Sequence, residues 1–299
     1  MKRGTLSYST LSSSLEAASF VPENSPARRV WRRFRRHRLA MAGVVLASLI
    51  FTLVIFAPVF TPNLPNKQDL KHRLAAPDLA HFMGTDELGR DVFSRVLFGG
   101  RISLLIGLSA MAVSVSVGTL IGSISGYFGG RVDTAIMRII DIIISFPTLF
   151  LLIMLASFLG SNIVIVILVI GLLSWMRVAR LVRAGFISIK ERDFIMAARA
   201  LGSSSSRMVF GHLLPNSLGP IIVAATIDVS GAILTESALS YLGLGIQPPQ
   251  ATWGNMLRFA QDQMAVAPWT AIFPGLMIFL VSIAINFIGD GLRDAFDPR

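Results

Sequence analysis

Six long apolar windows limit what this chain can fold into. Each runs for about 20 residues or more with almost no charge, which is the length that an α-helix needs to cross a bilayer. Only 15% of the 299 residues are charged. The windows lie at about 39–60, 102–128, 134–159, 162–185, 214–236 and 268–289. Because lipid offers the backbone no hydrogen-bonding partner, they predict helices, and we expect an all-α polytopic membrane protein with six transmembrane helices.

Clusters of basic residues beside these windows predict the orientation. RRVWRRFRRHR at 28–38 directly precedes the first window, and a second basic segment covers 177–207. Lys and Arg are enriched on the cytoplasmic side of membrane proteins, so both termini and 177–207 are expected in the cytoplasm. Because both basic clusters lie beside membrane spans, we expect them to set the orientation of the protein and to contact anionic lipid, and not to bind nucleic acid.

The windows and charges together divide the chain. The parts are a disordered, basic cytoplasmic tail at 1–38 with no signal peptide, a first transmembrane helix at 39–60, an outer loop at 61–101, and a core at 102–299 with a cytoplasmic loop at about 186–214. In the outer loop, apolar and polar residues alternate over 85–95 in a way that predicts a short amphipathic helix on the membrane face. Two ion pairs one turn apart, Asp86–Arg90 and Asp91–Arg95, would support that helix.

The second window carries a stripe of small residues. Its members recur every four positions and are Ala110, Ser114, Gly118, Gly122 and Gly126. One face of this helix is therefore almost without side chains, which lets another helix approach closely. The stripe predicts packing within this chain, packing against a second membrane subunit, or the lining of a path.

The polar segment 192–216 lies between two apolar windows and is short and helix-prone. Four of its residues share one helix face: Phe194, Ala197, Ala198 and Leu201. The two Ala residues would let a partner approach, and Gly202 can end the helix. Leu214 and Pro215 suit the first turn of the next span. This face is expected to contact a partner protein or, alternatively, lipid headgroups.

The segment resembles the coupling loop of permease subunits of ABC importers. That pattern is Glu-Ala-Ala, three residues, Gly, nine residues, then Ile-x-Leu-Pro, and the matching residues here are Ala197, Ala198, Gly202, Leu214 and Pro215. Met196 stands at the usual Glu position and His212 at the Ile position.

Four further motifs narrow the resemblance to the DppC/OppC type, the second permease of dipeptide, oligopeptide and nickel importers. They are HFMGTDELGRDVFSRVLFGGR at 81–101, GYFGGRVDTAIMRIIDIIISFP at 126–147, ESALSYLGLGIQPPQATWGNML at 236–257, and FPGLMIFLVSIAINFIGDGLRDAFDP at 273–298. The resemblance implies the type I ABC importer permease fold in a prokaryotic plasma (inner) membrane.

The same resemblance implies a set of partners. A homologous second permease subunit would complete the pathway, two cytoplasmic ATPase subunits would grip the coupling helix, and an extracytoplasmic binding protein would deliver a peptide substrate. The chain has no G-x-x-x-x-G-K-[ST] phosphate loop, so we expect no cofactor and no enzymatic activity in this chain, with ATP and Mg on the partner ATPases. Alternatives are a nickel or metal-chelate importer permease and an autonomous secondary transporter with an ion site at Asp228.

Ionisable residues inside the apolar windows are costly and indicate function or pairing. Arg138 and Asp141, three residues apart, predict a structural ion pair. Asp228, near the middle of the fifth window, has no basic neighbour in sequence, so it is expected either to line the translocation path and meet a substrate ammonium group or to make a hydrogen-bonded helix contact. Glu236 is expected at the outer interface. The histidines form no close metal-binding pair, and we expect no metal site.

Overall fold

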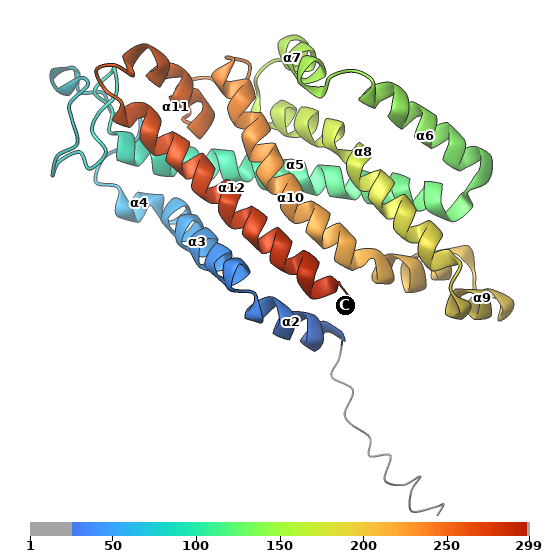
Figure 1. The fold of residues 1–299 in the computed structure, drawn as a ribbon. Helices are drawn as coiled ribbons and strands as arrows, with labels where there is room; N and C mark the ends of the chain where they lie inside the picture. Colours follow the sequence, from blue (N-terminus) through green and yellow to red (C-terminus); the bar gives the residue numbers. More distant parts are fainter. Residues whose placement is uncertain (1–25, 298–299) are drawn as a thin grey trace, which may run out of the picture.

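The computed structural model describes residues 26–297, and within that range the protein is built from helices without a β-strand (Figure 1). The helices are α2 (Pro26–Arg36), α3 (Arg38–Ile55), α4 (Ala57–Phe60), α5 (Val92–Phe128), α6 (Gly130–Ile144), α7 (Thr148–Leu159), α8 (Ile163–Lys190), α9 (Asp193–Ala200), α10 (Leu214–Tyr241), α11 (Trp253–Ala260) and α12 (Trp269–Phe296). The predicted all-α class is confirmed.

Within residues 26–297, five helices are long and apolar enough to cross a membrane. They are α3, α5, α8, α12 and the continuous helical stretch Arg207–Tyr241, which contains α10. The third predicted span, 134–159, is not one continuous helix, because α6 and α7 meet at an angle of 82°. Pro147 lies at the bend, where it lacks an N–H donor and disfavours helical geometry at the residue before it. Counted as one broken crossing, the pair brings the total to six.

The bundle has two ends, named here by the helix that each carries. The α9 end holds α9, α2, the C-terminal end of α12 and the turn between α5 and α6, whereas the α11 end holds α11, α4 and the loop 61–91 (Figure 1). Gly129 and Gly130 form the turn with φ of +66° and +52°, a conformation that favours glycine.

The small-residue stripe of α5 packs against α8. A Cβ atom added at Gly118 would lie 2.6 Å from Val178 Cβ, and one added at Gly122 would lie 2.5 Å from the carbonyl oxygen of Ala179. The two helix backbones therefore approach more closely than larger side chains would allow. Of the roles predicted for the stripe, packing within this chain is the one that the structure shows.

The N-terminal prediction needs correction from residue 26 onwards. The basic segment is the helix α2, and its Phe34 is buried in a cluster with Ala40 and Ala295. An apolar side chain placed among arginines lets the helix pack on α12 while the arginines stay outside. The prediction of disorder for residues 1–25 lies outside the described residues.

The predicted amphipathic helix at 85–95 is wrong. Residues 85–91 form a turn closed by a bridge between Thr85 and Asp91, and α5 begins at Val92, ten residues before the predicted window. Gly89 has a φ of +70°, and an added Cβ there would overlap the carbonyl group of Asp69. Because Gly89 has a left-handed backbone conformation and packs against another loop, an α-helix cannot continue through this position.

The charges of this turn are buried and paired. Arg90 Nε lies 2.6 Å from Asp86 Oδ2, which confirms that predicted pair, and Arg95 Nε lies 3.4 Å from the same oxygen. Asp91 does not pair with Arg95; it accepts hydrogen bonds from the Ser94 backbone at the start of α5 and contacts His81 Nδ1 at 3.0 Å. The charges thus fasten the loop to the bundle.

Candidate coupling helix and intramembrane charge site

The helix α9 protrudes between the two long helices α8 and α10 at the α9 end (Figure 1). Its last turn is followed by Gly202 with a φ of +80°, and the N–H of Ser203 donates to the carbonyl of Ala198 at 3.1 Å. This left-handed glycine satisfies carbonyl groups that a helix end leaves free. The predicted role of Gly202 as the end of the helix is confirmed.

One face of α9 is anchored and another is exposed. Ile195 is completely buried in a cluster with Met208 and Leu213, and Ala198 is half-buried against the same cluster. The exposed residues, named here the coupling surface, are Phe194, Met196, Ala197 and Leu201. Leu201 is 87% exposed. Three of the four predicted face residues therefore share the surface, and Ala198 turns towards the bundle.

Past α9 the chain enters a π-helical segment, Arg207–Leu213, that runs directly into α10. Leu214 is half-buried and Pro215 lies in the first turn of α10, as predicted. Since the helical path is unbroken from Arg207, α9 connects to a 35-residue stretch that extends towards the α11 end.

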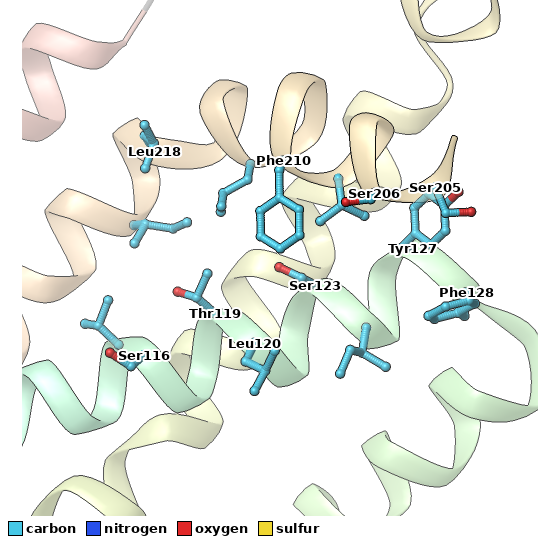
Figure 2. A pocket seen from close by; sticks show the side chains of 15 residues that line it. Ser116, Thr119, Leu120, Ser123, Tyr127, Phe128, Ser205, Ser206, Phe210 and Leu218 are labelled. Carbon is cyan, nitrogen blue, oxygen red and sulfur yellow. The ribbon is translucent and has the colours of Figure 1, made fainter. Parts of the chain in front are cut away.

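An apolar groove of about 600 Å³ lies beside this connection, between α5 and the segment 205–221 (Figure 2). Leu120, Phe128 and Phe210 lie along it, and the hydroxyls of Thr119 and Ser123 are also among its lining groups. The Thr119 oxygen is buried and has no hydrogen-bond partner within the described residues. No sequence pattern predicts this groove, because its two walls are about 90 residues apart in the chain.

Asp228 is buried near the middle of α10 and is paired. Its Oδ2 accepts a hydrogen bond from Ser114 of α5 at 2.9 Å, and its Oδ1 lies 3.2 Å from Nη1 of Arg177 on α8. The predicted hydrogen-bonded helix contact is therefore present. Spacing along α10 could not reveal Arg177, which lies 51 residues earlier in the chain.

Two cavities adjoin this ion pair. One of about 710 Å³ is lined by Asp228 and by residues from the C-terminal end of α12, and the other, of about 370 Å³, lies among α7, α8 and α10. Arg177 and Arg180 line both cavities. The charged groups of α8 thus lie where the two cavities adjoin.

The predicted pair between Arg138 and Asp141 is wrong. Asp141 accepts a hydrogen bond from Arg180 Nη2 at 2.5 Å, and Asp133 of the same helix binds Arg183, with Nη2–Oδ2 at 2.6 Å. Arg180 and Arg183 lie three residues apart on α8 and face α6. They reach the two aspartates from a neighbouring helix, so pairing within α6 is not needed.

Glu236 is also misplaced by the sequence prediction, since it is fully buried and does not reach the interface. Its carboxyl group accepts a hydrogen bond from Ser240 at 2.7 Å and one from Ser103 at 3.3 Å. Ser103 also accepts a hydrogen bond from the Trp253 backbone at 3.2 Å. This network joins α5, α10 and α11.

A bundle of membrane-crossing helices with a protruding helix between two crossings and a charge pair inside is an arrangement that suits a subunit of a membrane transport system. The chain belongs to the family of inner membrane components of binding-protein-dependent transport systems, which matches residues 118–299. Residues 25–77 match the N-terminal transmembrane domain of oligopeptide transport permease C.

Curated relatives cover most of the chain. A Brucella suis protein described as a peptide permease is 44% identical over 283 residues, 94% of each chain. The dipeptide transport system permease protein DppC of Alkalihalophilus pseudofirmus is 41% identical over 275 residues, 92% of this chain and 90% of the relative. The oligopeptide transport system permease protein OppC of Haemophilus influenzae is 42% identical over 270 residues, 90% and 87% respectively.

Proposed function

We propose that this protein forms one half of the transmembrane pathway of an ATP-driven peptide importer, with a homologous second permease as the other half. The α9 end faces the cytoplasm and the α11 end faces outwards, where an extracytoplasmic binding protein delivers substrate. The arginines of α2 and α8 support this orientation, because basic residues are retained on the cytoplasmic side. The membrane is the inner membrane of a prokaryote.

The observation that carries the proposal is the coupling surface of α9. A helix that is anchored by fully buried Ile195, yet leaves Leu201 87% exposed, is built to fit a groove on another protein. Two cytoplasmic ATPase subunits, which bind ATP and Mg, would each hold one such helix on one permease. Because α9 joins α8 to α10, a rigid-body movement of the ATPase would be transmitted to the intramembrane charge site.

The substrate class follows from the relatives, whose names specify peptides, dipeptides and oligopeptides. We infer that this chain also transports peptides, in preference to nickel or a metal chelate. Asp228 lies along the translocation path in this proposal, because it lines the larger of the two cavities between the helices.

A charge placed on the coupling surface tests this function. Leu201→Asp should abolish copurification of the ATPase subunits and reduce ATP-driven peptide uptake at least tenfold, since an unpaired carboxylate would be desolvated in the contact. Leu79→Asp is a matched control, because Leu79 is 93% exposed at the opposite end of the bundle. That variant should retain the ATPases.

Reconstituted vesicles that contain the permease pair, the ATPases and the binding protein provide the measurement. Normal uptake by Leu201→Asp would contradict the coupling role of α9. Transport of peptide by this chain without ATPases would contradict the subunit assignment.

A further inference from the structure

The two cavities on the α8–α10 side of the bundle adjoin at two arginines. The larger cavity extends along α8 and α10 to Arg293 near the end of α12, and the smaller one is lined by Thr148 of α7 and Thr235 of α10. Arg177 and Arg180 are lining residues of both cavities. A molecule that moves from one cavity to the other therefore passes their guanidinium groups.

Each of these guanidinium groups is held by one carboxylate and keeps donors available. Arg177 donates to Asp228 at 3.2 Å while its side chain is 69% exposed. Arg180 donates to Asp141 at 2.5 Å and is 45% exposed. A guanidinium has five N–H donors in a planar fork, so most donors of both groups are free to bind a ligand in the cavities.

Asp228 is placed to hold Arg177 in position. Its side chain is nearly inaccessible, and Ser114 binds its second oxygen at 2.9 Å. A buried charge among membrane helices is costly to retain. Asp228 is buried and holds Arg177, so it acts as an anchor, whereas the exposed guanidinium is the group that a ligand can reach.

We propose that Arg177 and Arg180 bind the C-terminal carboxylate of the transported peptide where the two cavities adjoin, with Asp228 as the positioning residue of Arg177. This inference rests on the proposed function as a peptide permease. Residues three apart lie on the same helix face, so both forks can approach one carboxylate. Planar carboxylates match guanidinium forks in bidentate geometry, which a point charge cannot reproduce.

The test compares one peptide with its C-terminal amide in the reconstituted complex, with each uptake rate corrected for the affinity of the isolated binding protein. The wild type should favour the free acid about tenfold, the size expected for one charge-assisted contact. The double variant Arg177→Gln/Asp228→Asn removes both charges and leaves neither unpaired. It should lose most of the preference for the free acid, because only Arg180 remains to bind the carboxylate, and copurification of the ATPase subunits checks that the complex still assembles.

A neighbouring ion pair supplies the matched control. Arg183 and Asp133 join α8 to α6, as Arg177 and Asp228 join α8 to α10, but they line neither cavity, so Arg183→Gln/Asp133→Asn should keep the wild-type preference. If Arg177→Gln/Asp228→Asn keeps the wild-type preference for the free acid, the proposal is wrong and the ion pair serves only to join α8 and α10.

An anionic lipid headgroup is the other ligand that the two arginines could bind. Vesicles of phosphatidylcholine alone and vesicles that also contain phosphatidylglycerol distinguish the two ligands, because a peptide site gives the same preference for the free acid in both kinds of vesicle. If the double variant changes only the dependence on phosphatidylglycerol, the site binds lipid and the proposal is wrong. A wild-type complex that transports nickel chelates and no peptide would instead refute the proposed function, and this site with it.

Discussion

Among the glycines where α5 packs on α8, Gly122 leaves the least space between a side chain and the backbone of α8. We expect Gly122→Ala to destabilise the protein by about 1–3 kcal/mol, because the new Cβ would lie 2.5 Å from the Ala179 carbonyl oxygen and the helices would have to separate. Thermal unfolding of the purified complex measures this. Gly231→Ala is the control, since that glycine is also helical and has no atom within 4 Å of an added Cβ. Equal melting temperatures for the two variants would contradict the packing argument.

Glu236 provides a second test at the residue scale. Glu236→Gln keeps the shape; its amide oxygen still accepts from one of Ser103 and Ser240, and its amide nitrogen can donate to the hydroxyl of the other. We therefore expect a change in the free energy of unfolding within about 1 kcal/mol. Glu236→Ala leaves a cavity and buried hydroxyls without a partner, and should cost about 2–4 kcal/mol. Denaturation of the two variants side by side gives the difference. A Gln variant as unstable as the Ala variant would show that the negative charge itself is required.

Residue-scale predictions from the sequence succeeded where the signal was periodic and failed where it was not. Small residues that recur every four positions in α5 predict a helix face without large side chains, and this prediction does not depend on which helix packs there. The structure shows that this face contacts α8. The partners of Asp141 and Asp228 come from another helix, Arg180 and Arg177, and spacing within one helix contains no information on its neighbours. Arg138 was nearest in sequence, but the arginines of α8 are nearer in space.

At the scale of elements, the turn at 85–91 contains the most densely buried charges of the α11 end. Asp86 accepts hydrogen bonds from the Leu88 and Arg90 backbones and from the Arg90 side chain. Asp86→Ala should destabilise this end by about 3–5 kcal/mol, because Arg90 loses its main partner while it remains buried. Glu87→Gln, at a more exposed partner of Arg90, should cost less than about 1 kcal/mol. Limited proteolysis of loop 61–91 measures both, and similar cleavage rates would refute the difference.

Local signals also explain which elements were predictable. The end of α9 is specified by Gly202 and the start of α10 by Pro215, both of which act through their own backbone geometry. The bend at Pro147 was missed because apolar composition continues across it. The helix expected at 85–95 has suitable polarity, but Gly89 fits against Asp69 of a distant loop, and only the folded chain contains that contact.

At the scale of the whole molecule, the path of the bent pair α6–α7 determines the topology. The turn at Gly129–Gly130 lies at the α9 end, while Leu152 of α7 packs with Ile106 and Ile246, near the α11 end. The pair therefore carries the chain from one end to the other, as a crossing does and a re-entrant loop does not. Six crossings place both described ends of the chain on the same side as α9.

Single cysteines test this topology without background, because the chain has no cysteine. In spheroplasts, a membrane-impermeant maleimide should label Ala80→Cys in the exposed loop 61–91 and Ser161→Cys after α7. Ser204→Cys, next to the coupling surface, should react only in inside-out vesicles. Labelling of Ser161→Cys only in inside-out vesicles would mean that α6–α7 re-enters, which would force α8 to run in the opposite direction and expose Ser204→Cys in spheroplasts. Gly118 of α5 faces Val178 and Gly126 faces Phe186, so α8 runs parallel to α5 and a reversal would break these contacts. We therefore expect Ser161→Cys to follow Ala80→Cys.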